Sequence, residues 1–505
     1  MVFRRILIAN RGEIAVRVMR TCRELGIESV AVYSEVDRDA LHTLYATHAI
    51  DVGAAPSRES YLNIPRIIEA AGRAGADAIH PGYGFLSERA AFARACAEAG
   101  IVFIGPSPEA IEVMGDKMRA RAKMIEAGVP VVPGSQDPVT STTAARETAQ
   151  RLGYPVMLKA SAGGGGRGMR LVRSEREIDA SFEAASREAL AAFGDGSVYL
   201  ERFIERPRHI EVQVFGDTHG RIIHLNEREC SIQRRNQKVI EEAPSDFIDA
   251  ALRARMGEIA VRAARAVNYV GAGTVEFLVD EAKNFYFLEM NTRLQVEHPV
   301  TELTTGYDLV EAQIRVAQGG HLNMETRPPR GHALEARVYA ENPAAGFQPS
   351  PGKIVALEMP SGPGVRVDAG VHQGYVVPSH YDAMLAKIIA YADDRPTATR
   401  RLDRALSECR VSGIDTNVPY LRQILNHPEF AAGRTDTGFI ERHMTSLASA
   451  SPHEQQVALI AACIEHFERT RQGATRPVHT DDRGVERSSW RTFSHPGRPW
   501  GGCGH

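Results

Sequence analysis

In the first hundred residues, short apolar runs typical of strands alternate with segments whose apolar residues have helical spacing. Short apolar runs at 6–9 and 29–33 predict strands, and residues 12–25 between them carry apolar side chains at helical spacing. The order continues with a helix at 67–71 and strands at 77–80 and 101–105. We therefore expect an open α/β domain. The turn after the first strand reads NRGE and lacks the GxGxxG pattern, which argues against a dinucleotide site.

The next part of the chain contains a glycine-rich run. A helix is predicted at 115–128, and strands at 154–161 and 169–173 flank a stretch with five glycines in six positions, 163–168. An isolated run of this kind favours a flexible linker. Between two strands of one hairpin, a loop whose N–H groups fold over a phosphate is the better interpretation, with Lys159 placed to meet phosphate oxygens. The spacing is not that of a P-loop.

The segment 284–298, NFYFLEMNTRLQVEH, combines a polar and an apolar face. With strand periodicity, one face carries Phe285, Phe287, Glu289, Asn291, Arg293, Gln295 and Glu297, and the other carries Tyr286, Leu288, Met290, Thr292, Leu294 and Val296. We expect the second, mainly apolar face to anchor the strand. Carboxylate and amide oxygens suit Mg²⁺ and Arg suits an oxyanion, so spacing alone supports a functional site and a solvated face equally.

The strand before this segment brings a second acid. A strand predicted at 271–280 carries Glu276, and a short turn joins it to the segment, so Glu276 and Glu289 are expected on adjacent antiparallel strands. A shared divalent cation would remove the conflict between the two acids. A fully extended chain from Glu289 to Glu297 would span roughly 26 Å, which is too far for one small site. If both acids serve one site, the strand must end near Asn291 and the following residues must turn back over the metal.

Charged residues are concentrated between 208 and 238. A strand predicted at 208–215 places His209, Glu211 and Gln213 on one face. Residues 224–238 have the composition of a charged surface hairpin, and a helix follows at 249–267.

The last third of the chain changes character twice. Residues 331–445 predict a compact α+β domain with a helix at 397–409. Residues 454–469 can form an amphipathic helix, and 470–505 have a composition that favours disorder. Trp490 and Trp500 in this tail suggest a docking segment, and an end without a role is an equal alternative.

Composition narrows the class of protein. At 505 residues the chain has room for roughly three domains, and a formal net charge of −3 gives no reason to expect a nucleic-acid or membrane surface. No run approaches a membrane span of about 18 apolar residues, and the N-terminus lacks the features of a signal peptide. The six cysteines show no CxxC spacing, so we expect neither a disulfide framework nor a zinc site, and we expect a cytoplasmic location.

Several motifs in fixed order carry a resemblance to a known family. These are HPGYGFLSE at 80–88, KASAGGGGRGMR at 159–170, RRNQK at 234–238, GTVEFLV at 273–279 and EMNTRLQVEHP at 289–299. Over residues 3–445 the chain closely resembles biotin carboxylase, the ATP-grasp component of biotin-dependent carboxylases.

The resemblance implies a multidomain α/β and α+β fold. The implied parts are an N-terminal open α/β (pre-ATP-grasp) domain at 1–112, a central ATP-grasp domain at 113–330 with a mobile lid at about 131–203, a C-terminal biotin carboxylase domain at 331–445, and a helix with a flexible tail at 446–505.

The resemblance also implies site residues. ATP would be held by Lys117, Lys159, Gly165, Gly166, Glu201, Arg202, Phe203, Ile204 and His209. Two Mg²⁺ or Mn²⁺ ions would be bound by Glu276, Glu289 and Asn291; bicarbonate by Lys238, Arg293, Gln295 and Val296, with Glu297 as its base; and Arg337 would face the biotin ureido group. The chain has Asn236 where the family commonly has His, and Asn can hydrogen-bond a ribose but carries no charge.

The implied reaction is ATP-dependent carboxylation of biotin through carboxyphosphate, with Arg337 stabilising the biotin enolate. The sequence has no Met-Lys-Met biotinylation segment, so we expect biotin on a separate biotin carboxyl carrier protein, a carboxyltransferase on another chain, and a homodimer. Acetyl-CoA is the favoured final acceptor; pyruvate or another 2-oxo acid is the alternative. A different ATP-grasp ligase, such as a carbamoyl-phosphate-forming enzyme, and a non-catalytic ATP-binding scaffold are the competing functions.

Overall fold

The structure of the protein is a computed structural model. It describes residues 2–135, 137–160, 169–193 and 196–444, with residues 456, 459–464 and 467. The chain divides into two compact units, Met1–Leu447 and Ala448–His505, and the account below concerns the first. Among the helices in the described residues, none is long and apolar enough to cross a membrane.

The N-terminal region is an open α/β layer, as predicted. Its parallel sheet has the order β3-β2-β1-β4-β5. The strands are β1 (Arg5–Ile8), β2 (Glu28–Ser34), β3 (His48–Gly53), β4 (Ala78–His80) and β5 (Val102–Phe103), and the main helices are α1 (Gly12–Glu24), α3 (Ile64–Ala74) and α4 (Ala90–Glu98). Alternation along β1 gives each face its own core: Ile6 and Ile8 join one cluster, and Leu7 joins the other.

Helix α3 is longer than the predicted 67–71. The Asn63 side chain accepts a hydrogen bond from the Arg66 N–H, Pro65 occupies the first turn, and Gly75 ends the helix with φ of 61°. These three capping features extend the helix beyond its apolar stripe.

A small three-stranded sheet surrounds the glycine-rich run. Its order is β7-β6-β8, with β6 (Val156–Ala160), β7 (Met169–Val172) and β8 (Val198–Arg202), and α7 (Thr142–Leu152) and α8 (Glu175–Phe193) pack on it. The antiparallel pairing of β6 with β7 confirms the predicted hairpin. The loop between them lies outside the described residues. The helix predicted at 115–128 is α6 (Lys117–Glu126), which begins two residues later because Asp116 caps it and ends the preceding α5 (Pro108–Gly115).

The site is built on a large antiparallel sheet of order β13-β12-β9-β10-β11-β14-β21-β19. Its strands are β9 (Arg208–Gly216), β10 (Ile222–Arg234), β11 (Gln237–Ala243), β12 (Gly271–Val279), β13 (Phe285–Asn291), β14 (His332–Tyr339), β19 (Val365–Ala369) and β21 (Met384–Ala392). The sheet is continuous across residue 330, because β11 pairs with β14. The predicted domain limits stay predictions.

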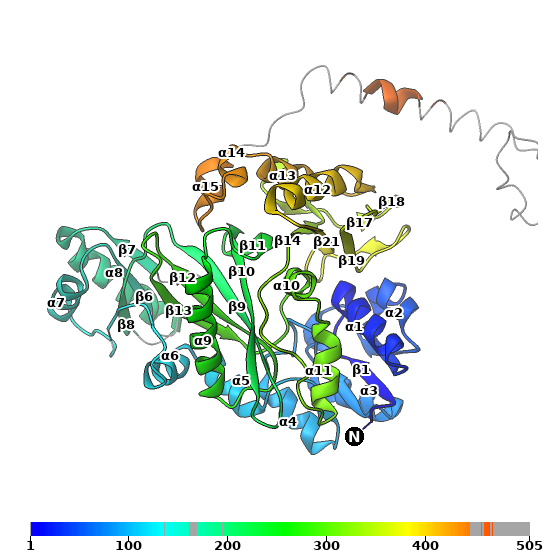
Figure 1. Ribbon diagram of the computed structural model, residues 1–505, viewed down its shortest axis with the longest axis horizontal. Helices are drawn as coiled ribbons and strands as arrows, with labels where there is room; N and C mark the ends of the chain where they lie inside the picture. Colours follow the sequence, from blue (N-terminus) through cyan, green and yellow to red (C-terminus); the bar gives the residue numbers. More distant parts are fainter. Residues whose placement is uncertain are drawn as a thin grey trace, which may run out of the picture. The chain divides into compact units, whose positions relative to one another are not determined.

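The two faces of this sheet differ in polarity. Helix α9 (Ala250–Arg265), predicted at 249–267, packs on β9, β10 and β12 (Figure 1). Ile210, Val212 and Val214 of β9 join α9 in one hydrophobic cluster. The alternate residues of β9 therefore point to the opposite face, toward α10 (His298–Thr305). The C-terminal helix predicted at 397–409 is α12 (Arg395–Glu408), which packs on β14 and β21.

Two sequence predictions about this sheet are wrong. In β13 the apolar anchor is not Tyr286 and Leu288; Phe285, Phe287 and Met290 are buried, and Leu288 is exposed. The cause is an irregularity in the β12–β13 ladder: Phe277 pairs with Phe287, but the adjacent Glu276 pairs with Glu289. The extra residue, Leu288, inverts the alternation, so the aromatic rings face the core and Glu289 faces the site.

The second error concerns residues 224–238. They form the predicted hairpin, β10 and β11, but not a surface one. Most of β10 is buried, and Arg228 is 0% exposed. Only the turn at Arg235 and Asn236 is exposed. Charge density misled the prediction because these charges are paired inside the protein.

Candidate functional site

Lys238 is the centre of a cluster of ion pairs. Its ammonium nitrogen lies 2.9 Å from Glu276 Oε1, 2.6 Å from Glu297 Oε1 and 2.5 Å from Glu211 Oε2. These carboxylates come from β12, the N-terminus of α10 and β9. Burial lowers the pKa of Lys238, but the three carboxylates outweigh it, and the pKa stands well above its usual value. The cluster therefore presents a fixed cation among acids.

Glu297 joins Lys238 to Arg337. Arg337 NH2 donates to Glu297 Oε2 over 2.8 Å, and the same guanidinium binds Glu241. Burial raises the pKa of Glu297, but the charges of Lys238 and Arg337 lower it further, so the net shift is downward. Burial raises the pKa of Glu241 to about 7 although Arg337 opposes the change. The Glu297 carboxylate is thus ionised and held on both oxygens.

The predicted metal ligands lie together, Glu276 within β12 and both Glu289 and Asn291 at the end of β13. Glu276 and Glu289 are direct partners in the ladder, as predicted. Asn291 Nδ2 donates to Glu276 Oε1 over 2.8 Å, and His209 Nε2 lies 3.0 Å from Glu276 Oε2. Partial burial and the charge of Glu276 raise the pKa of Glu289. The two carboxylates fit a divalent cation, which would offset this repulsion, and Asn291 would have to turn its amide oxygen toward the ion to join them.

The chain turns back after β13, as predicted. The strand ends at Asn291 and α10 begins at His298, so residues 292–297 form a turn that returns Glu297 to the Lys238 cluster. Gln295 Nε2 donates to Glu276 Oε1 over 2.8 Å, which ties this turn to β12. The main-chain oxygen of Val296 accepts a hydrogen bond of 2.7 Å from Lys387.

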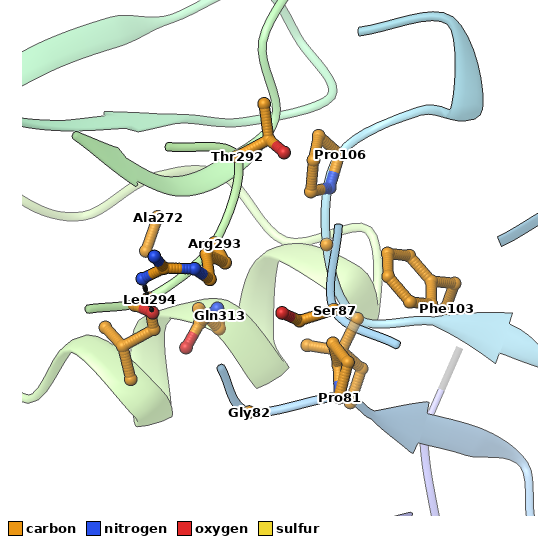
Figure 2. Close-up of a pocket in the computed structure, with 12 residues that line it drawn as sticks. Pro81, Gly82, Ser87, Phe103, Pro106, Ala272, Thr292, Arg293, Leu294 and Gln313 are labelled. Carbon is orange, nitrogen blue, oxygen red and sulfur yellow. Dashed lines mark hydrogen bonds between the residues drawn. The ribbon is translucent and has the colours of Figure 1, made fainter. Parts of the chain in front are cut away.

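Arg293 points to a different partner. Its Nε donates to Glu88 Oε2 over 2.9 Å, and its NH2 donates to Asn291 Oδ1 over 3.0 Å. Figure 2 shows Arg293 with Leu294 and Gln313 at a small pocket that Pro81, Gly82, Ser87, Phe103 and Pro106 also line. No residue of this pocket binds Lys238 within the described part of the chain. Arg293 is therefore next to the cluster but is held from the N-terminal region.

The predicted nucleotide residues are brought together only in part. Lys159 and Glu201 form an ion pair across β6 and β8, and Arg121 NH1 lies 3.6 Å from Glu201 Oε1. Arg202 and Phe203 are fixed through their main-chain N–H groups, which donate to the carbonyls of Pro133 and Pro155, and Ile204 is buried. Lys117 begins α6, and its positive charge partly opposes the upward shift in the pKa of Glu289. Gly165 and Gly166 lie outside the described residues.

Asn236 occupies the tip of the β10–β11 turn. Its φ is 66°, and that of Arg235 is 51°, so both residues are in the left-handed region. Asn is among the residues that tolerate this conformation. Asn236 therefore suits the local backbone.

Sequence reasoning missed Lys387 and Arg228, and it gave Glu88 only as weak evidence of a site, from its place in the turn at 81–88. Glu88 binds Arg293; Lys387 is 0% exposed and lies 3.3 Å from Glu13 Oε1; Arg228 bonds to Glu211 and Gln295. A lysine within the apolar run MLAKIIAYA was a usable signal for Lys387, because a buried charge requires a partner. The partners of all three are distant in sequence.

Comparison with known proteins covers nearly all of the described unit. Residues 2–111 match the family model "Biotin carboxylase, N-terminal domain", 116–325 match "Carbamoyl-phosphate synthase L chain, ATP binding domain", and 335–442 match "Biotin carboxylase C-terminal domain".

Two relatives and one solved structure illustrate the similarity. A biotin carboxylase of Halalkalibacterium halodurans is 54% identical, over 89% of this chain and 100% of the relative. One of the pyruvate carboxylase subunits of Methanothermobacter thermautotrophicus is 49% identical, over 93% of this chain and 100% of the relative. The biotin carboxylase domain dimer of Hydrogenobacter thermophilus 2-oxoglutarate carboxylase, with MgADP, ADP and bicarbonate, has a TM-score of 0.82 and 46% identity, over 89% of this chain and 100% of that one.

Proposed function

Because the chain belongs to the biotin carboxylase family of ATP-dependent ligases, we propose that it carboxylates biotin on a separate carrier protein, with bicarbonate as the carbon source. The observation that carries this proposal is the position of Lys238, bonded to Glu211, Glu276 and Glu297, with Arg337 on the far oxygen of Glu297. The two cations are suited to attract an anionic substrate, and Glu297 between them is the carboxylate that can act as its base.

The first step is proton removal from bicarbonate by Glu297. In the structure Lys238 and Arg337 make this carboxylate a weak base. We infer that a bicarbonate bound beside Lys238 draws both cations toward itself, which raises the pKa of Glu297 and permits the transfer. The carbonate oxygen then attacks the γ-phosphorus, ADP leaves, and carboxyphosphate forms.

The second step transfers the carboxyl group. Carboxyphosphate breaks into CO₂ and phosphate, the phosphate takes the N1′ proton of biotin, and N1′ forms the new bond to CO₂. Arg337 stabilises the enolate oxygen of the ureido ring. Its guanidinium is positioned for this by Glu241 and Glu297, which bind it from a neighbouring strand and a helix terminus.

Two groups of residues serve the substrates. Mg²⁺ or Mn²⁺ would be held by Glu276, Glu289 and Asn291, and when bound it would supply positive charge to the transferring phosphoryl group. We assign ATP to Lys117, Lys159, Gly165, Gly166, His209, Asn236 and the segment Glu201–Ile204, and bicarbonate to Lys238, Arg293, Gln295 and Val296.

We propose that the chain works with a biotin carboxyl carrier protein and a carboxyltransferase, as a homodimer; the 2-oxoglutarate carboxylase neighbour is a domain dimer. Acetyl-CoA is our proposed final acceptor. The similarity to the Methanothermobacter pyruvate carboxylase chain supports a 2-oxo acid as the alternative. The two acceptors can be separated by incubating the protein with each pair of carrier and transferase and detecting which carboxylated product forms.

The test of the core activity is ADP release at fixed ATP and Mg²⁺. We expect it to require bicarbonate and to rise with free biotin. A rate of ADP release that requires bicarbonate but does not change with biotin would favour a carbamoyl-phosphate-forming ligase. Nucleotide binding without ADP release would favour a scaffold, and either result contradicts the proposal.

A further inference from the structure

Arg228 is a wholly buried arginine whose donors are all used. It lies on β10 opposite Glu211, its register partner on β9. It is 0% exposed. The acceptors are Glu211 Oε1 (2.5 Å), Gln213 Oε1 (2.7 Å), Thr301 Oγ1 (3.0 Å), Thr274 Oγ1 (3.0 Å) and Gln295 Oε1 (2.7 Å). One side chain thus joins β9, β12, the 292–297 turn and α10.

Stability alone is a weak reason for such a residue. Desolvation of a buried ion pair offsets much of its attraction, and an apolar side chain of similar volume often replaces it without loss. What an apolar side chain cannot supply is five donors in a fixed plane. The reason for an arginine at this position therefore lies in the groups that it orients.

The most informative partner is the Gln295 amide. Arg228 offers only donors, so it fixes the oxygen of this amide toward itself. The NH₂ group then faces Glu276, to which it donates over 2.8 Å. A flipped amide would oppose donor to donor at Arg228 and acceptor to acceptor at Glu276. Arg228 thus determines that Gln295 presents hydrogen-bond donors toward the Lys238 cluster.

Glu211 is the second group that Arg228 orients. One of its oxygens binds Arg228, and the other binds Lys238. Without Arg228, Glu211 would keep a single cationic partner and could rotate about its remaining contact. Lys238 would then lose a fixed position among its three carboxylates.

We propose that Arg228 is a positioning residue for the bicarbonate site: it aims the NH₂ of Gln295 at the anion and fixes Glu211 against Lys238. The inference rests on the proposed function, because it concerns the same anion. If the Gln295 amide were flipped, its oxygen would face the bicarbonate anion. We therefore expect the affinity for bicarbonate to fall and the affinity for the nucleotide to stay the same.

The test uses Arg228→Met and Arg228→Lys in the full chain. We expect the bicarbonate KM to rise at least tenfold in both, with the dissociation constant for ATP within twofold of wild type. Lysine keeps the charge but cannot reach Gln213, Gln295 and Thr274 together, so it separates orientation from charge. If Arg228→Met does not fold, as judged by circular dichroism, the lysine variant carries the test.

Arg395→Lys is the matched control. Arg395 is also buried, and it donates to Glu242 and to the carbonyl of Phe430, with no contact to the 292–297 turn. We expect it to lower the thermal midpoint and leave the bicarbonate KM unchanged. Equal KM shifts in Arg395→Lys and Arg228→Lys would show a general loss of structure and overturn the proposal.

A double-mutant cycle with Gln295→Ala tests the route of the effect. If Arg228 acts through Gln295, Arg228→Met should change the bicarbonate KM much less in the Gln295→Ala background than in the wild type. Full additivity would overturn that route. A wild-type protein without a bicarbonate response would instead contradict the proposed function.

Discussion

Replacement of Glu297 by glutamine removes the proposed base with almost no change of shape. Glutamine keeps one acceptor oxygen and places an NH₂ group where the second carboxylate oxygen stands. In the structure those oxygens accept from Lys238 over 2.6 Å and from Arg337 over 2.8 Å. One of the two cations would therefore face a donor. We expect turnover to fall by a factor of roughly 10² to 10⁴, the usual contribution of general acid–base catalysis.

This factor corresponds to about 3 to 5 kcal/mol of transition-state stabilisation. The assay is the initial rate of ADP release at saturating ATP, bicarbonate and biotin. A parallel titration measures the affinity for ATP, which we expect to stay within a few-fold of wild type, because Glu297 contacts neither Lys159 nor Glu201.

Glu227→Gln provides a control for the loss of a buried carboxylate. Glu227 is equally buried and binds both Arg253 and the Ser245 N–H, but it does not touch Lys238. It should lose stability and keep its rate constant. The reasoning is refuted if Glu297→Gln retains more than about a tenth of the wild-type rate, or if its main defect is in ATP binding.

Three further predictions follow from the site. Asn236→His should lower the KM for ATP if that position touches the nucleotide, with little change in thermal midpoint, because His also tolerates a φ of 66°; an unchanged KM contradicts the nucleotide assignment. Chelation with EDTA should abolish ADP release, and Glu289→Gln should raise the Mg²⁺ concentration needed for half-maximal rate; an unaltered requirement removes Glu289 from the ligands. Burial raises the pKa of Glu241 from 4.5 to about 7, so its contribution to stability is present below pH 4.5 and lost as the pH rises through 7. Glu241→Gln should therefore flatten the fall in thermal midpoint between pH 5 and 8. An unchanged slope contradicts the raised pKa.

Local patterns predicted the parts of the fold that short segments determine. Hydrophobic periodicity located the N-terminal strands and helices, and the short turn between β12 and β13 made the pairing of Glu276 with Glu289 predictable. The length of an extended chain, together with the assignment of Glu289 and Glu297 to one site by resemblance, predicted that residues after Asn291 turn back. The extra residue at Leu288 was not predictable, because strict alternation assumes a regular ladder.

Long-range pairing explains the rest. Arg228 looked like a surface charge because three of its acceptors, Thr274, Gln295 and Thr301, lie far along the chain. Glu88 stood in a glycine-rich turn, and only the fold brings it to Arg293. A sequence shows which residues are charged, whereas burial and partners decide which of those charges belong to a site.

Carboxylation of free biotin is the most direct test of the account. The protein is incubated with ATP, Mg²⁺, free biotin and isotopically labelled bicarbonate, and labelled carboxybiotin and ADP are measured together. We predict ATP-dependent labelled carboxybiotin in the wild type and roughly a hundredfold less, or lower still, in Glu297→Gln. ADP formation without labelled biotin in the wild type, or equal labelling in Glu297→Gln, would contradict the account.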